Sequence, residues 1–305
     1  MFFKKNCYYK ENIKGVTYKI FEGYLSYKPK FCPKCGVLFD EFKSVKTAND
    51  AMSFLMADAI TGQTIDIVED RRLDNLIRYF FYYNYKARRR VTYIVIDMYS
   101  PYVFLYVKMF PNAQIIIDKF HLTQLVSRAF NKTKIMIMKK HKQHYRKLKR
   151  YWELLLKYRE NLDNSVWKRF TCFEHLMTTI DVVDYLINID EELKQTYLIY
   201  QDILHSLKTR NYKLLKSVLI NSNNNISSYM KTAVKTLSEF LPYIKNTFTT
   251  NYHNGYIEEN NILIKVIKRI AFGFRSFRRF KARIMISKGL IKMNKNSQCI
   301  TALTT

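Results

Sequence analysis

The run Val91-Thr92-Tyr93-Ile94-Val95-Ile96 constrains the fold of this chain more than any other feature. It is apolar at nearly every position, so both faces of the strand that it predicts must be buried. Strands buried on both faces lie in the middle of sheets that helices cover on each side. Asp97 follows directly, and in open α/β sheets ligands bind at the carboxyl ends of such strands. The run therefore predicts an α/β fold with a candidate site at Asp97.

Segments on both sides of this run predict the rest of the sheet. Strand-like patterns occupy 37–42, 52–57 and 63–68, and a further apolar strand is expected at 113–117. Helical spacing of apolar residues predicts a helix over 73–85. The order strand, strand, strand, helix, strand, strand is that of a ribonuclease-H-like mixed sheet, whose first three strands are antiparallel.

The charge of the chain points to a nucleic-acid partner. Its 52 Lys and Arg exceed its 25 Asp and Glu, and the formal charge of +27 favours a polyanion over a membrane surface. Residues 119–250 are expected to be helical throughout, and the segment 139–150 within them is strongly basic. We interpret it as a phosphate-contacting face that uses Lys142, Arg146 and Lys149. A basic run can also be only a solvated helix face, and that alternative stays open.

Composition also suggests where such a chain works. No run of about 18 apolar residues predicts a membrane span, and the first residues lack the apolar stretch of a signal peptide, so we expect a cytoplasmic protein with no membrane partner. The five cysteines are an odd set without a disulfide pattern, which suits a reducing compartment. Only 7 Gly and 5 Pro leave little room for linkers, so we expect one compact unit.

Three carboxylates, Asp40, Asp97 and Glu258, lie where a strand or a helix can deliver them to one point. Asp40 and Glu41 are neighbours on a predicted strand, so only one of them can join a cluster on a given face. Glu258 falls in the first turn of a helix predicted over 256–272. Three carboxylates can hold two divalent cations, Mg²⁺ or Mn²⁺, about 4 Å apart for an in-line phosphoryl displacement. For each acid alone a structural role is the alternative, and a first-turn glutamate also suits the helix dipole.

The helix that carries Glu258 also carries donors. Asn261, Lys265 and Lys268 follow Glu258 at spacings of three to four residues, so all four would share one helix face. Such donors can reach a DNA backbone beside the carboxylate.

Several short motifs keep their order and spacing in two dense blocks, 91–130 and 253–284. They are Val95-Ile96-Asp97-Met98-Tyr99 with Tyr102, Phe110-Pro111-Asn112-Ala113, Asp118-Lys119-Phe120-His121, Asn254-Gly255-Tyr256-Ile257-Glu258 with Asn261, Ile264 to Arg269, Ala271 to Arg275, and Phe280 to Ile284. In these motifs the chain resembles the ISL3 family of insertion-sequence DDE transposases, from about residue 22 to residue 286.

The resemblance implies a ribonuclease-H-like DDE catalytic domain over 37–305 that an all-helical insertion interrupts at about 122–250. It makes Asp40, Asp97 and Glu258 the first, second and third metal-binding acids. It also implies metal-dependent DNA strand cleavage and strand transfer, double-stranded DNA of transposon ends and target as the partner, self-association on that DNA, and a nucleoid-associated protein of bacteria. The candidate DNA contacts in the matched motifs are Asn261, Lys265, Lys268, Arg269 and Arg275.

Asp118 is the main competitor of Asp40 as the first acid. In related DDE enzymes an acid or a cysteine followed three positions later by histidine lies just after the fifth strand, and Asp118 with His121 matches that arrangement. We interpret the pair as one that orients a metal ligand or a scissile phosphate. A buried, hydrogen-bonded histidine is the alternative.

The segment 1–36 resembles the remnant of a zinc-ribbon region. Cys32 and Cys35 form one knuckle, but a structural zinc site needs four ligands and no second pair follows, which favours free thiols. Family members also carry a helix-turn-helix region ahead of the catalytic domain. Cys35 lies five residues before Asp40, and a helix-turn-helix does not fit between them, so we expect that region to be missing there.

Two other functions compete with a transposase. The first is a catalytically inactive, transposase-derived remnant that only binds DNA. The second is a zinc-dependent hydrolase that uses His121, His141 and His144. Cations beside His141 and His144 oppose the binding of a dication there, so the sequence disfavours the hydrolase.

Overall fold

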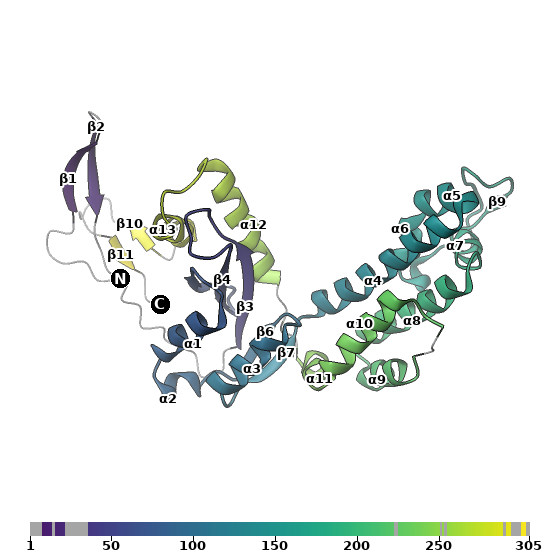
Figure 1. Cartoon of the computed structure of the whole chain (residues 1–305), viewed down its shortest axis with the longest axis horizontal. Coiled ribbons are helices and arrows are strands. Elements are labelled where there is room, and N and C mark those ends of the chain that lie inside the picture. Colours follow the sequence, from purple (N-terminus) through teal and green to yellow (C-terminus); the bar gives the residue numbers. More distant parts are fainter. Residues whose placement is uncertain are drawn as a thin grey trace. The chain divides into compact units, whose positions relative to one another are not determined.

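The structure is a computed structural model. It describes residues 36–222, 225–250, 252 and 255–288 in full, and the backbone of short strands at 8–13, 16–21, 291–293 and 300–302. The chain divides into two compact units (Figure 1). The first comprises Met1–Ile115 and His253–Thr305, and the second comprises Ile116–Tyr252. The expectation of one compact unit is therefore wrong, because the residues between the two parts of the first unit bury a core of their own.

The first unit contains a five-stranded sheet of order β5-β4-β3-β6-β7. β3 pairs antiparallel with β4 and β4 pairs antiparallel with β5, whereas β3 and β6 run parallel. This mixed α/β architecture is compatible with a ribonuclease-H-like core, and each expected strand is present. The strands are β3 (Gly36–Lys43), β4 (Met52–Asp58), β5 (Thr64–Val68), β6 (Tyr93–Ile96) and β7 (Gln114–Ile117).

The helix expected over 73–85 is two helices in the structure. α1 (Leu73–Phe81) buries Leu76 and Phe80. α2 (Tyr85–Arg88) is a separate turn of helix, because the side chain of Asn84 accepts a hydrogen bond from the backbone N–H of Ala87 and starts a new helix there.

A helix that the sequence did not predict, α3 (Ser100–Met109), lies between β6 and β7. Its apolar residues fall on all sides of the helix: Tyr102 and Tyr106 are buried, while Phe104 and Val107 are exposed. The pattern therefore lacks the apolar stripe by which an amphipathic helix is found in a sequence.

Aromatic rings hold α1 and α3 against the sheet. Phe39 of β3 is the centre of this cluster, and the centroid of its ring lies 4.7 to 6.1 Å from those of four rings: Phe54, Phe80, Tyr106 and Phe110. Such pairs add about 0.5–1.5 kcal/mol each beyond the burial of their area. The cluster therefore fixes the strand that carries Asp40.

The helices near the C-terminus complete the first unit. α12 (Gly255–Ile270) contacts β3 and packs through Ile257, Ile264 and Ile267 (Figure 1). α13 (Phe277–Ser287) packs through Phe280, whose ring centroid lies 6.1 Å from that of Phe42 on β3. Two antiparallel hairpins belong to the same unit: β1 (Tyr8–Ile13) with β2 (Val16–Phe21), and β10 (Ile291–Met293) with β11 (Ile300–Ala302).

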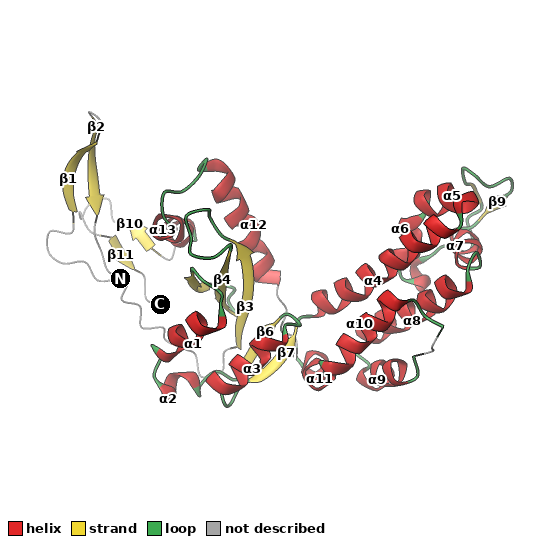
Figure 2. Ribbon diagram, in the orientation of Figure 1, coloured by secondary structure: helices red, strands yellow, loops and turns green. Residues whose placement is uncertain are grey.

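The second unit is built mostly of helices (Figure 2). Residues 119–250 were expected to be helical throughout, but the stretch between Leu156 and Thr179 contains a short 3₁₀ turn and a small hairpin of two strands. The elements are α4 (Lys119–Lys140), η1 (Lys142–His144), α5 (Tyr145–Arg150), α6 (Trp152–Leu156), η2 (Arg159–Asn161), β8 (Lys168–Arg169), β9 (Leu176–Met177), α7 (Thr179–Ile187), α8 (Glu191–Lys208), α9 (Tyr212–Ile220), α10 (Ser228–Glu239) and α11 (Leu241–Thr249).

α4, α8 and α10 form the core of the second unit. Phe130 stacks on Tyr200 with ring centroids 4.8 Å apart. A buried chain of polar groups crosses the same three helices, because the Thr133 hydroxyl bonds the Ser227 hydroxyl at 2.5 Å and the Ser227 N–H donates to Thr196 Oγ1 at 3.1 Å. Among the helices that the structure describes, none is long and apolar enough to cross a membrane.

Candidate functional site

The parallel pairing of β3 and β6 sets Asp40 beside Asp97. Gly36 lies opposite Tyr93 and Leu38 lies opposite Val95, and the same offset of 57 positions leads from Asp40 to Asp97. Neighbouring strands are about 4.8 Å apart, so the two carboxylates leave the sheet close together. Both line one pocket of about 230 Å³, which has room for several waters or for hydrated cations, since a water occupies about 30 Å³.

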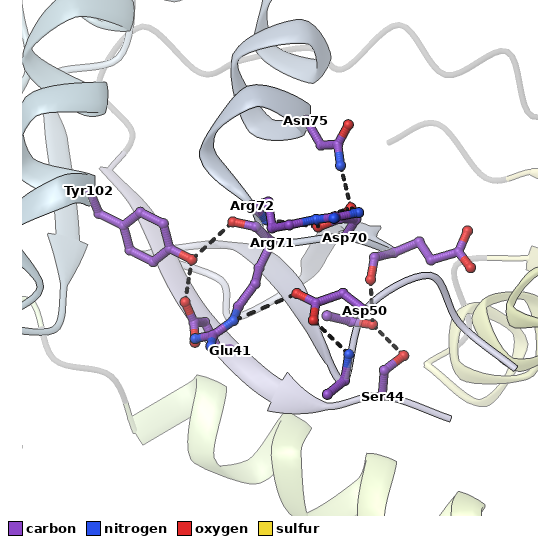
Figure 3. Close-up of polar contacts among 11 residues, drawn as sticks. Glu41, Ser44, Asp50, Asp70, Arg71, Arg72, Asn75 and Tyr102 are labelled. Atoms are coloured by element: carbon purple, nitrogen blue, oxygen red, sulfur yellow. Dashed lines mark hydrogen bonds and ion pairs between the residues drawn. The ribbon is translucent and has the colours of Figure 1, made fainter. Parts of the chain in front are cut away.

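Asp40 and its neighbour Glu41 point to different parts of the fold. Asn261 on α12 donates from Nδ2 to Asp40 Oδ2 at 2.9 Å, and the Glu41 N–H donates to Asp40 Oδ1 at 2.7 Å. Glu41 instead accepts hydrogen bonds from Tyr102 of α3 and from Arg71 (Figure 3). The two side chains thus leave β3 in different directions, as the alternation of strand side chains requires, although both border the same pocket.

Glu258 lies in the first turn of α12, exposed to solvent, three positions before Asn261. This spacing puts both residues on one face of the helix. Within the residues that the structure describes, no group of three or more His, Cys, Asp or Glu side chains lies close enough together to hold a metal ion. The structure therefore brings Asp40 and Asp97 together and does not gather Glu258 with them.

The start of α12 packs closely against Gly62, in the turn between β4 and β5. Gly62 has φ of +69°, and a Cβ added to it would lie 2.6 Å from the ring of Tyr256. Asn260, which is 1% exposed, donates from Nδ2 to the Gly62 carbonyl at 3.5 Å. Only glycine allows both this backbone conformation and this approach. The position of Glu258 thus depends on a glycine about 200 positions earlier in the chain.

Two tyrosines on α3 line the same pocket as neutral groups. Burial, and then the hydrogen bond to Glu41, raises the pKa of Tyr102 well above its usual range. Burial also raises the pKa of Tyr106. Arg71 is the one cation among the described residues that line the pocket.

Two of the expected DNA contacts on α12 are engaged within the protein. Asn261 binds Asp40, and Lys268 donates from Nζ to the carbonyls of Lys43 and Ser44 at 2.6 and 3.2 Å. Burial, followed by the charges of Lys43 and Lys265, lowers the pKa of Lys268. Lys268 therefore ties α12 to the end of β3. The other three candidates, Lys265, Arg269 and Arg275, are exposed.

Asp118 and His121 lie in the second unit, at the start of α4. The Asp118 side chain is 3% exposed, and its Oδ2 lies 4.0 Å from His121 Nε2. The two side chains therefore lie near each other, and their role in orienting a ligand or a phosphate stays a prediction.

The basic run of the second unit is exposed at the three expected positions: Lys142 on η1 and Arg146 and Lys149 on α5. Lys140 and His141, which precede them, both bind Asp190 Oδ2 at 2.8 Å.

The histidines of the hydrolase hypothesis do not meet. His121 lies in the first turn of α4 and His141 follows its last residue, so about 30 Å of helix separates them. This distance contradicts a zinc site built from both residues. Cys32 and Cys35 lie outside the described residues. Cys172, which is described, is free and exposed.

Sequence patterns alone assign no role to Arg71 or to Tyr102. Tyr102 was recognised only as part of a motif, and Arg71 not at all. The one local signal for Arg71 is the change from acidic to basic residues in Glu69-Asp70-Arg71-Arg72 at the end of β5, which is common at exposed turns.

Comparison with known proteins gives one family and one partial relative. A model of DDE transposases of the ISL3 type, described as "Transposase", matches residues 39–284. A protein of Lactococcus lactis subsp. lactis named "ATP-dependent protease" is 42% identical over 113 residues, which are 37% of this chain and 36% of that protein. The chain thus matches about a third of the length of that relative. No solved structure matches.

Proposed function

The chain belongs to the ISL3 family of transposases, and we propose that it catalyses the metal-dependent cleavage and strand transfer of insertion-sequence DNA. The observation that carries the proposal is the parallel pairing of β3 and β6, which sets Asp40 beside Asp97 at one pocket. Two adjacent carboxylates, Asp40 on β3 and Asp97 just after β6, suit an enzyme that acts on phosphodiesters through bound cations.

Asp40, Asp97 and Glu258 are the residues that we assign to divalent cations. Their carboxylate oxygens are ligands that Mg²⁺ and Mn²⁺ prefer, whereas His and Cys would select zinc. When bound, such cations polarise the scissile phosphate and activate the attacking oxygen. Asn261 donates to one Asp40 oxygen and the Glu41 N–H donates to the other, which holds the carboxylate in one orientation. Asn261 therefore orients the first acid.

The exposed cations are assigned to the DNA backbone. Those of the first unit are Lys265, Arg269 and Arg275, and those of the second are Lys142, Arg146 and Lys149. Phosphate contacts position a protein on duplex DNA without reading its sequence. We assign Asp118 and His121 to orienting the DNA, and we expect copies of the chain to assemble on it.

A catalytically inactive remnant that only binds DNA is the second candidate. The separation of Glu258 from the other two acids favours it, because a DDE enzyme needs all three carboxylates. The remnant would keep the basic surfaces and would not cleave DNA with any cation.

The name of the Lactococcus relative suggests no function here. An ATP-dependent enzyme commonly binds the nucleotide with a loop of the pattern G-x-x-x-x-G-K-[ST], and this sequence has no such pattern.

Cleavage of a labelled duplex with Mg²⁺, with Mn²⁺ and with neither tests the proposal. We expect nicked or cut strands with either cation and none in EDTA. Retained duplex binding without cleavage under all three conditions would favour the inactive remnant. Cleavage that persists in EDTA would contradict both.

A further inference from the structure

Glu41, Arg71 and Tyr102 form a linked group (Figure 3), and all three line the pocket that Asp40 and Asp97 also line. Arg71 Nη1 donates to Glu41 Oε2, and the Tyr102 hydroxyl donates to Glu41 Oε1. The same hydroxyl lies 3.2 Å from the backbone oxygen of Arg71. Both the backbone and the side chain of Arg71 are thus tied to neighbours. Since the Arg71 cation already neutralises the charge of Glu41, Glu41 is a poor alternative to Asp40 as a cation ligand.

Arg71 keeps N–H groups that can donate to a ligand, although Glu41 and Tyr102 hold it in place. Its side chain is 39% exposed and lines the pocket that contains Asp40 and Asp97. A second acid, Asp50, lies 3.8 Å from its Nε, which is too far for a hydrogen bond. A guanidinium has five N–H donors, and within the described part of the chain only Glu41 accepts one. The remaining donors suit an anion with several oxygens, because the planar guanidinium matches phosphate in a bidentate way.

We propose that Arg71 binds a phosphate of the DNA backbone in the pocket of Asp40 and Asp97, and that Glu41 and Tyr102 are the positioning residues that hold its guanidinium there. The inference rests on the proposed function, since it takes the substrate to be DNA, and it adds the residue that contacts the phosphate. It also explains why Arg71, the one cation among the described residues that line this pocket, is bonded to Glu41 and yet stays 39% exposed.

Charge explains why Glu41 is part of the arrangement. An unpaired arginine would repel divalent cations held by Asp40 and Asp97, because like charges at short range oppose each other. Paired with Glu41, Arg71 forms a neutral group that still offers N–H donors. Tyr102 stays protonated beside Glu41, so it supplies a hydrogen bond without adding charge.

The competing explanation is that Arg71 only ties the end of β5 to β3. The neighbouring Arg72 provides a matched control, since it also pairs with an acid, Asp70, but is 66% exposed and does not line the pocket. If both arginines are merely structural, Arg71→Gln and Arg72→Gln will have the same effect on DNA binding and on cleavage.

The first measurement is the affinity for a labelled duplex, in EDTA, at several salt concentrations. Arg71→Gln should weaken binding about tenfold, and it should reduce the slope of log affinity against log salt by about 0.9, the value for one phosphate contact. Arg72→Gln should leave the slope unchanged. Equal slopes for wild type and Arg71→Gln, with equal melting temperatures, would overturn the inference.

The second measurement is single-turnover cleavage with Mn²⁺ at saturating duplex. Arg71→Gln should lower the rate about a hundredfold or more, and Arg71→Lys should recover part of the binding but little of the rate, because lysine lacks the bidentate geometry. Glu41→Gln removes a negative charge and loosens the guanidinium, so we expect duplex affinity to be kept or raised while the rate falls. A parallel fall of affinity, rate and melting temperature in Glu41→Gln would show a structural role instead.

The two measurements separate the inference from the proposed function. If wild-type protein binds duplex but never cleaves it, the proposed activity fails while the salt slope still tests Arg71. If wild type cleaves and Arg71→Gln matches Arg72→Gln in both rate and slope, the activity stands and the role of Arg71 is wrong.

Discussion

The two units of the chain use polar side chains in opposite ways. The sheet-containing unit gathers a few at one pocket, and each has a defined partner: Asp40 with Asn261, Glu41 with Arg71 and Tyr102. The helical unit buries hydroxyl groups in its core and displays its basic run on the surface. From this difference we expect the proposed function to depend on the exact position of side chains in the first unit and on summed charge in the second. One isosteric change should therefore disable the first unit, whereas several changes are needed in the second.

The largest expected effect is on the rate of cleavage, and it comes from an isosteric substitution of one carboxylate in the pocket. Asp97→Asn should lower the rate of metal-dependent cleavage by about a thousandfold, and it should leave duplex affinity in EDTA within about twofold, because it removes a cation ligand and no phosphate contact. Single-turnover cleavage and fluorescence anisotropy measure the two quantities.

Asp40→Asn should be as harmful as Asp97→Asn, and Asp118→Asn less so. The reverse order would make Asp118 the first acid and would move part of the catalytic chemistry to the other unit, which breaks the comparison.

The next effect concerns the helical unit. Reversing the charges of Lys142, Arg146 and Lys149 together should weaken duplex binding about a hundredfold and flatten its salt dependence by about 0.9 per lost contact. The single reversals should each give about a third of the change in slope. Binding titrations at three or more salt concentrations measure both the affinity and the slope.

A second triple variant serves as the control for net charge. Lys213, Lys216 and Lys231 are exposed in the same unit, so reversing them changes the formal charge equally. An identical loss of affinity and slope in both variants would mean that the basic run has no special part in binding.

A smaller effect, on stability, tests the contact of Gly62 with Tyr256 at the start of α12. Gly62→Ala should lower the unfolding free energy of the first unit by about 2 kcal/mol, because the new Cβ meets the Tyr256 ring in a left-handed backbone conformation. Gly273 also has a positive φ, of +125°, but a Cβ there would meet nothing within 4 Å, so Gly273→Ala adds backbone strain without a clash and should cost about 1 kcal/mol. Urea unfolding compares the two.

Cleavage should also fall more in Gly62→Ala than in Gly273→Ala, since Glu258 lies two residues after Tyr256. Equal cleavage rates in the two variants would show that the contact of Gly62 with Tyr256 does not govern the position of Glu258.

The smallest effect is a pH dependence in the helical unit. Burial raises the pKa of Asp190, but hydrogen bonds from Lys140 and His141 outweigh it, and the net pKa is lowered. Because the folded-state pKa is lowered, the ionised carboxylate stabilises the fold at every pH above the usual pKa of aspartate, about 4. This stabilisation is lost as the pH falls below about 4 and through the folded-state pKa. Asp190→Asn, which keeps the helix cap, should lower the melting temperature by about 2 °C at pH 7.

This difference between wild type and Asp190→Asn should vanish as the pH falls below about 4. A difference that is constant from pH 7 to pH 3 would mean that the charge of Asp190 contributes nothing.

Much of the sheet could be predicted because its strands are short apolar runs bounded by polar turns. The placement of Asp40 beside Asp97 follows from the same patterns, since neighbouring strands that run parallel end at the same edge. α3 could not be predicted, because apolar residues cover its whole circumference. Local patterns predicted one compact unit, because they do not show which helices share a core; the helical insertion at about 122–250 was implied only by the family resemblance.

The candidate site was only partly predictable for a related reason. Carboxylates at strand ends can be recognised from position, but the Arg71–Glu41 pair joins a turn to a strand 30 residues away. Such a contact depends on tertiary packing and leaves no period in the sequence. The same holds for Asn261, which was expected to face DNA and instead binds Asp40.

The contact between Asn261 and Asp40 spans 221 positions of sequence, and the whole helical unit is encoded between Asp97 and α12. A ribosome that adds roughly 5–20 residues per second needs about 8 to 30 s to travel from the second acid to the third. During that interval the nascent chain already displays the basic run of α5, while its third carboxylate has not been made. The basic run is therefore synthesised before Glu258, so any cleavage that needs all three proposed acids has to wait until α12 has been made.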